Sequence, residues 1–263
     1  MKTCIFCKTD LAISGRAKEH IVPRWLQEAW ELSEQVIEPT HFDEVGGVKS
    51  SRRHVLNSFL SGNVCAKCNN GWMSQLEVEC KSLILSLAHD KRRILTLEDG
   101  EALLLARWAV KTAYSLHASA NWRKVIPDEH YVVLDADDFR LPPGIFVVGH
   151  TYKSSSIFSW TQSTTWPINY RGVEITDAEK ADLQNSGYKF SLRIGGLFLT
   201  VFHIPLKRAL PCLWKFRHVP LYPRCSHPVM WQVDDQPWPS NVEARFQIFH
   251  QLLSLSIDGV GEA

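Results

Sequence analysis

The sequence predicts an α+β protein in which a small metal-stapled N-terminal module is followed by helices and a C-terminal α+β region. Three observations predict this class. Two Cys-x2-Cys pairs lie 61 positions apart, at Cys4/Cys7 and Cys65/Cys68. Apolar residues then recur at helical spacing after the second pair. Beyond about residue 130, segments rich in β-branched and aromatic residues are separated by Pro and Gly, which is typical of strands and turns.

The composition is that of an ordinary globular protein, with 45% hydrophobic and 22% charged residues among 263. Its apolar runs are too short to cross a membrane, and the start MKTCIFCKTD lacks the apolar core of a signal peptide. We therefore expect a cytoplasmic protein without a membrane partner. A soft boundary near residue 90 divides a zinc module, 1–90, from an α+β region, 91–263, that would recognise substrate or partner. Nothing in the sequence indicates an oligomeric state.

The cysteine spacing predicts a structural zinc site. Each Cys-x2-Cys turn can bring two sulfurs to one ion, and two such turns complete a closed tetrahedral site of Cys4, Cys7, Cys65 and Cys68. A redox-active pair is the alternative, but such a pair usually stands alone. Among the other cysteines, Cys80 is expected to be a buried apolar residue. Cys212, Cys225 and His227 are spaced poorly for a metal site, so ordinary packing is expected there.

We call the two Cys-x2-Cys turns, at Cys4/Cys7 and Cys65/Cys68, knuckles. The sequence also predicts the helices and strands between and after them. An extended strand should cover 18–23, and 26–62 should form an insertion of helix and loop. Apolar positions from Met73 to Leu87 lie on one helical face, and a second helix is expected from about 98 to about 118. The segments 131–134, 145–148 and 188–204 are predicted to be strands.

The order Cys-x2-Cys, then Glu19-His20-Ile21-Val22-Pro23, then Cys-x2-Cys-Asn resembles the zinc-stapled HNH endonucleases, which have a ββα-metal fold. The resemblance covers roughly residues 1–80. It implies that His20 is the general base and that Glu19 and Asn69 hold a catalytic Mg²⁺ or Mn²⁺. Asn70 is an alternative to Asn69, because an offset of one residue lies within the uncertainty of the match.

The resemblance also implies a middle Asn that braces the base, for which Asn57 is slightly favoured over Asn63. Histidine suits proton transfer near neutral pH, and oxygen ligands suit a hard divalent cation. Two features depart from the family pattern: His20 and Asn69 are 49 positions apart, and the last motif residue is Asn instead of His. Adjacent strand residues also point to opposite faces, so Glu19 and His20 share a site only if the strand bends. An Asn after a knuckle can equally cap the following helix.

Charge gives only local support for nucleic-acid binding. Residues 1–80 hold nine Lys/Arg against ten Asp/Glu, whereas 183–233 holds seven Lys/Arg and no acid, interleaved with aromatics. That segment predicts contacts with phosphates and bases, or else a β-rich surface whose aromatics face the core. The candidate nucleic-acid-binding residues are Arg52, Arg53, Lys207, Arg208, Lys215 and Arg217.

Together these features predict an HNH-type endonuclease that hydrolyses phosphodiester bonds, with DNA as the expected substrate. The alternative is a non-catalytic zinc-stabilised module that binds nucleic acid or protein. The expected ions are one structural Zn²⁺ and one catalytic Mg²⁺ or Mn²⁺.

Overall fold

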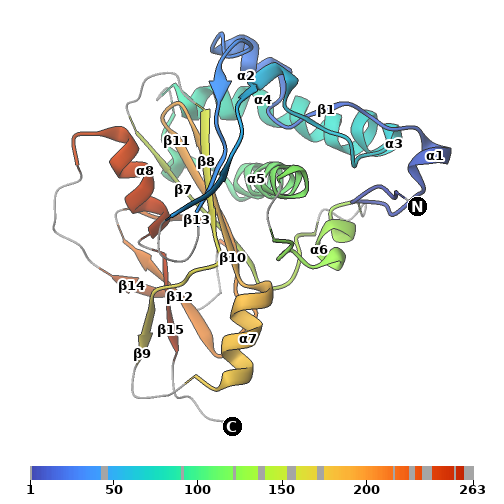
Figure 1. Ribbon diagram of the computed structural model, residues 1–263. Helices are drawn as coiled ribbons and strands as arrows, with labels where there is room; N and C mark the ends of the chain where they lie inside the picture. The colour runs from blue at the N-terminus through green and yellow to red at the C-terminus, as the bar shows by residue number, and fades with distance from the viewer. Residues whose placement is uncertain are drawn as a thin grey trace.

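The computed structural model describes residues 2–42, 47–89, 92–120, 123–135, 140–152, 158–170, 175–215, 217–224, 229–232, 239–251 and 253–257. The N-terminal part holds short elements around the two knuckles (Figure 1). Its helices and 3-10 turns are α1 (Leu11–Ser14), α2 (Arg24–Ala29), η1 (Leu56–Ser58), α3 (Ala66–Cys68), η2 (Asn69–Met73) and α4 (Ser74–Ala88); η2 is a π-helical turn. Its strands are β1 (Glu19–His20), β2 (Val36–Ile37), β3 (Thr40–Phe42), β4 (Val48–Ser51), β5 (His54–Val55) and β6 (Leu60–Ser61).

The rest of the chain builds two sheets and the helices that pack on them. Helical elements are η3 (Ile94–Thr96), α5 (Asp99–Ser119), α6 (Asp128–Val133), α7 (Asp177–Ser186) and α8 (Val242–Gln251). The strands are β7 (Ile145–Thr151), β8 (Phe158–Ser163), β9 (Ile168–Tyr170), β10 (Tyr188–Ile194), β11 (Leu197–His203), β12 (Ala209–Trp214), β13 (Val219–Tyr222), β14 (Met230–Gln232) and β15 (Ser254–Ile257).

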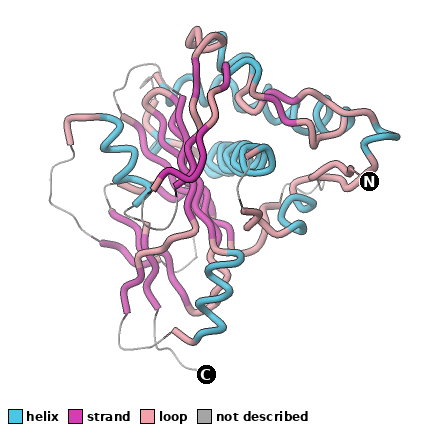
Figure 2. The backbone as a smooth tube through the Cα atoms, viewed as in Figure 1, coloured by secondary structure: helices cyan, strands magenta, loops and turns pink. Residues whose placement is uncertain are grey.

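A five-stranded antiparallel sheet of order β13-β7-β11-β10-β8 lies at the centre. Its central strands β10 and β11 are buried on both faces, and the side chains of the sheet alternate between two hydrophobic clusters. On β7, Ile145 and Val147 belong to one cluster, whereas Phe146 and Val148 belong to the other. Helix α5 covers the first face and α8 packs on β10 and β11 from the second (Figure 2). A smaller sheet of order β14-β12-β15-β9 stands beside them.

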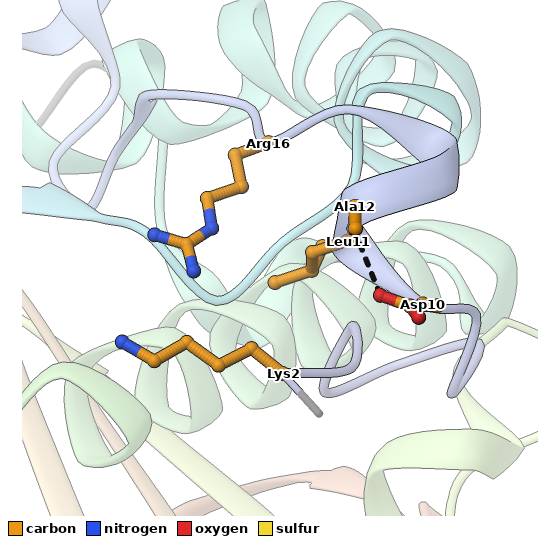
Figure 3. A pocket seen from close by; sticks show the side chains of 5 residues that line it. All are labelled: Lys2, Asp10, Leu11, Ala12 and Arg16. Carbon is orange, nitrogen blue, oxygen red and sulfur yellow. Dashed lines mark hydrogen bonds between the residues drawn. The ribbon is translucent and has the colours of Figure 1, made fainter.

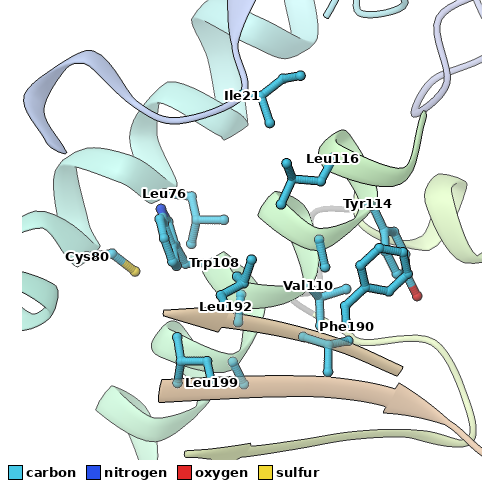
Figure 4. Packing of buried hydrophobic residues seen from close by; sticks show 14 of the residues in the cluster. Ile21, Leu76, Cys80, Trp108, Val110, Tyr114, Leu116, Phe190, Leu192 and Leu199 are labelled. Atoms are coloured by element: carbon cyan, nitrogen blue, oxygen red, sulfur yellow. The ribbon is translucent and has the colours of Figure 1, made fainter. Parts of the chain in front are cut away.

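Helix α5 joins the N-terminal part to the sheet. It packs on β7, β10, β11 and β13 on one side and on α4 and β6 on the other. Trp108 and Tyr114 are fully buried in this layer, beside Leu76 of α4 and Phe190 of β10 (Figure 4). Each such large side chain contributes about 1.5–3 kcal/mol through burial. One cluster therefore contains residues on both sides of position 90, and the proposed domain division there stays a prediction.

Several sequence predictions are confirmed and one is wrong. The helix near 98–118 and the strands at 145–148 and 188–204 are present, and of the strand expected over 18–23 only Glu19–His20 is a strand. The insertion at 26–62 holds five short strands, β2 to β6, besides helix and loop. Segment 131–134 is not a strand, because α6 begins after Pro127 with Asp128 and Glu129 in its first turn. Proline and acidic residues favour a helix N-terminus, and this signal outweighs the β-branched valines.

Among the described residues, no helix is long and apolar enough to cross a membrane.

Candidate metal centre and catalytic site

The sulfur atoms of the four predicted cysteines converge at one point. All four lie within 4.8 Å of one another, with 3.9 Å between Cys4 and Cys68 and 3.6 Å between Cys7 and Cys65. Four sulfurs at about 2.3 Å from a tetrahedral zinc would be about 3.8 Å apart. The cluster therefore fits a closed four-thiolate zinc site. Cys4, Cys65 and Cys68 are buried and Cys7 is partly exposed, so the ion would be shielded from solvent.

Local backbone geometry prepares the sulfurs for a metal. Lys8 takes a left-handed conformation, φ 59°, which closes the first knuckle. Backbone N–H groups of Cys65 and Cys68 donate to the sulfurs of Cys4 and Cys65, respectively, at 3.4 Å. A hydrogen bond from the Cys68 thiol lowers the pKa of Cys4 to about 4, with further help from backbone groups. One thiolate is thus available near neutral pH to begin metal binding.

The four-cysteine cluster joins the ends of an antiparallel pair of segments. The backbone of Arg16 forms an isolated β-bridge with Cys65. In the β1–β6 pair, Glu19 lies opposite Ser61 and His20 lies opposite Leu60. Helix α3 follows directly, with Cys65 at its N-cap, and continues through η2 into α4. The first knuckle also packs on α6, since Phe6 lies edge-on to Trp72 at 5.2 Å and near Tyr131 at 6.0 Å.

Glu19 belongs to a buried ion cluster. Lys111 of α5, whose side chain is 1% exposed, donates to Glu19 Oε1 at 2.8 Å and to Glu77 Oε1 of α4 at 2.6 Å. Burial alone would lower the pKa of Lys111, but the two carboxylates outweigh it and raise that pKa. Burial raises the pKa of Glu19, although Lys111 opposes the effect. One cation is shared by two carboxylates, so Lys111 stays protonated.

His20 faces a different set of neighbours. Arg24 Nε approaches His20 Nε2 at 3.4 Å, and the Asn57 side chain hydrogen-bonds the ring. Burial and the charge of Arg24 lower the pKa of His20, while Asn57 and Glu77 act against them. His20 is therefore neutral at pH 7. A surface pocket of about 320 Å³ beside it is lined by Arg24, Gln27, Glu28, Ser33 and Asn57.

The asparagines predicted for the site are placed differently. Asn57 lies beside His20, as noted. Asn63 lies in the segment between β6 and the second knuckle, where its side chain donates to the Ala118 carbonyl of α5 at 3.4 Å. Asn69 begins η2 and its amide donates to Asn70 at 3.1 Å. Among the described residues, no hydrogen bond joins Asn69 or Asn70 to Glu19 or His20.

The structure describes only one group of three or more Cys, His, Asp or Glu side chains close enough to hold a metal, and that group is the four-cysteine cluster. A hard cation at Glu19 would have to bind Oε2, because Lys111 occupies Oε1. For Asn69 to be a second ligand, its side chain would have to turn away from Asn70 toward that cation. The described residues thus fit a catalytic divalent cation only in part.

The predicted nucleic-acid-binding residues divide into two groups. Arg52 and Arg53 are exposed in the insertion, and Lys207 and Lys215 are exposed near β12. By contrast, Arg208 forms a two-point ion pair with Glu179, at 2.6 and 2.7 Å. Arg217 is only 5% exposed and stacks near Trp214.

Three neighbours of the candidate site, Arg24, Glu77 and Lys111, did not emerge from the sequence. Lys111 lies inside the apolar helix α5, and its partners are 92 and 34 positions away. The one available signal was a lysine inside an otherwise largely apolar helix. Cys80 and Cys212 are buried as expected; Cys225 and His227 lie outside the described residues.

No protein-family model matches the chain, and no curated protein or solved structure is significantly similar to it.

Proposed function

We propose that the protein is an HNH-type endonuclease that hydrolyses phosphodiester bonds, with DNA as its substrate. One observation carries the proposal: His20, with Asn57 beside its ring, lies on the β1–β6 pair, and the chain continues from β6 through Cys65 into the helix that carries Cys68. These two strands, which residues 21–59 separate along the chain, and the helix that follows them resemble the arrangement of a ββα-metal module. The neighbour of His20 is also the asparagine that the resemblance favours as its brace.

In this proposal, His20 takes the proton from the attacking water. A base must be unprotonated at the working pH, and burial together with Arg24 keeps His20 in that state. Because Nε2 accepts from Arg24, the neutral ring carries its proton on Nδ1. Movement of Arg24 to a substrate phosphate would free Nε2 for water.

Glu19, with Asn69 or Asn70, would hold the divalent cation, Mg²⁺ or Mn²⁺. Such a cation supplies positive charge to the scissile phosphate and the leaving oxygen. Lys111 fixes one oxygen of Glu19 and leaves the other for a ligand role, since a carboxylate has two acceptor oxygens. Hydrogen bonds to a ligating carboxylate commonly orient it in this manner.

A non-catalytic zinc-stabilised binding module is the second candidate. It is favoured by the same ion cluster, because Lys111 already neutralises Glu19 without any metal. In that case, His20 and Asn57 would be surface residues without a catalytic role.

The two functions separate in a cleavage assay. Purified, zinc-loaded protein is incubated with supercoiled plasmid and with single-stranded DNA, with Mg²⁺, with Mn²⁺ and with neither. The nuclease predicts metal-dependent nicking or linearisation that leaves 5′-phosphate ends. DNA binding without cleavage under every metal condition would support the module and reject the enzyme.

A further inference from the structure

The segment that carries His20 presents positive charge on one face. Its backbone pairs with 59–65 from Arg16 through Ile21, so the segment is extended throughout. Side chains along an extended segment alternate between faces. Ala17 and Ile21 are buried and Glu19 is turned to Lys111. Arg16, Lys18 and His20 therefore share the opposite face, where Arg16 and Lys18 are exposed.

A pocket extends this face at its Arg16 end. A surface pocket of about 400 Å³ is lined by Lys2, Asp10, Leu11, Ala12 and Arg16. The side chains of Lys2 and Arg16 extend in the same direction across it (Figure 3). Asp10 lines the same pocket, and its carboxylate accepts from the Ala12 backbone N–H at 2.8 Å, which caps α1; among the described residues it forms no ion pair with Lys2 or Arg16.

At the other end, the face reaches Arg24, whose guanidinium lies 3.4 Å from His20 Nε2. Among the described residues, no ion pair involves Lys2, Arg16, Lys18 or Arg24. Acids also lie near this face: Asp10 caps α1 and lines the pocket at the Arg16 end, Glu28 lines the pocket beside Arg24, and Glu77 lies close enough to His20 to act on its pKa. Four exposed cations thus form a continuous row that passes the histidine.

We propose that Lys2, Arg16, Lys18 and Arg24 form a phosphate-binding track, which grips the backbone of one nucleic-acid strand and leads it past His20. This inference rests on the proposed function for its meaning, but it concerns binding and can be measured without cleavage. Alternate residues of an extended segment are about 6.6 Å apart, comparable to neighbouring phosphates on a strand. The track offers cations and no groups arranged to read bases, so binding should be independent of sequence.

The test compares two triple variants of the full-length, zinc-loaded chain. Each carries His20→Ala, so that DNA remains intact. The track variant has Lys2→Gln, Arg16→Gln and Lys18→Gln. The control has Lys49→Gln, Lys81→Gln and Arg93→Gln, which removes the same charge and the same residue types from exposed positions elsewhere. Affinity for a short labelled duplex and a labelled single strand is measured by fluorescence anisotropy at several salt concentrations, without a chelator.

The track variant should bind DNA roughly tenfold or more weakly at about 50 mM salt. For duplex DNA, the slope of log K against log[salt] should be shallower by up to about 2.7, which is about 0.9 for each lost phosphate contact. The control should keep the parental affinity and slope. Zinc content and thermal unfolding should match in all proteins.

An equal loss in both triple variants, or no loss in the track variant, would overturn the track. So would binding of the parent to anionic lipid vesicles but not to DNA. A parent that binds through the track yet never cleaves, once His20 is restored, would reject the nuclease and leave the track standing.

Discussion

Two regions of this protein are rich in basic and histidine residues, but they use them in opposite ways. In the segment from Arg16 to Arg24, the cations are exposed and the histidine lies near the surface. In the C-terminal sheet, Arg193 pairs with Glu243 and Arg208 with Glu179, and Lys189 is buried. The C-terminal segment has the higher positive charge in sequence, yet much of that charge is engaged inside the fold.

This difference shows that the number of basic residues in a segment predicts an exposed cationic surface less well than their periodicity along the segment does. In the C-terminal segment, acids that are distant in sequence pair with Arg193 and Arg208. In the extended segment 16–20, alternation places the basic side chains on one face and the buried ones on the other. Four predictions can break or sharpen this comparison.

Loss of the metal should have the largest effect, and only in the N-terminal region. Zinc in comparable sites supplies about 10–16 kcal/mol of apparent binding free energy, as much as a whole domain's stability of about 5–15 kcal/mol. Cys65→Ser should abolish stoichiometric zinc and unfold the knuckles. Cys212→Ala, in the sheet, should keep one zinc per chain. Metal analysis and thermal unfolding measure both; a Cys65→Ser protein with unchanged Tm would contradict the structural role.

Lys111→Met should be the next most damaging change. It leaves Glu19 and Glu77 as buried carboxylates without a cation, which costs about 3–5 kcal/mol in urea unfolding. Adding Glu19→Gln and Glu77→Gln to Lys111→Met should recover most of the loss. Lys189→Met provides the comparison. Among the described residues, Lys189 contacts the carbonyls of His250 and Leu253 and the Trp166 ring but no carboxylate, so the loss should be smaller. Equal losses at the two lysines would contradict the ion cluster.

Acid should destabilise the sheet region through its buried histidines. Burial lowers the pKa to about 4 for His117, His130 and His150 and to about 3 for His218 and His250. Unfolded histidines titrate near 6.5, so the unfolded chain binds more protons below that pH. Stability is thus full above about pH 6.5 and falls as the pH approaches 4, by up to about 1.4 kcal/mol per histidine per pH unit.

This dependence is measured as the urea midpoint between neutral and mildly acidic pH. His218→Gln removes one titrating group, so its stability should fall less steeply with acid, although the variant starts less stable. An unchanged slope would show that His218 is not held neutral by the fold.

The smallest effects should come from exposed C-terminal cations. Lys207→Gln with Lys215→Gln should alter DNA affinity far less than the track variant does. Arg208→Gln should lower Tm slightly by removing the pair with Glu179 and leave DNA affinity unchanged. Anisotropy titrations test both, and a loss of affinity equal to that of the track variant would restore the C-terminal surface as the principal binding site.

The sequence predicted features that depend on local spacing. Cysteine spacing predicted the metal cluster, and apolar periodicity predicted α4 and α5. Features fixed by distant partners were not predictable. Lys111 finds Glu19 only because α5 packs beside β1, and Arg208 finds Glu179 across separate elements. Asn57 was distinguished from Asn63 only by a weak preference, because the folding of the insertion decides which of them reaches His20.

The central claim is that His20 does the chemistry in a module assembled by zinc. The most direct measurement compares plasmid cleavage by His20→Ala and by His89→Ala, an exposed histidine at the end of α4. Both proteins are brought to one zinc per chain and equal thermal stability is verified. We expect His20→Ala to lose about 10²–10⁴-fold in rate and His89→Ala to cleave at the parental rate. Cleavage by His20→Ala at the rate of His89→Ala would contradict the account.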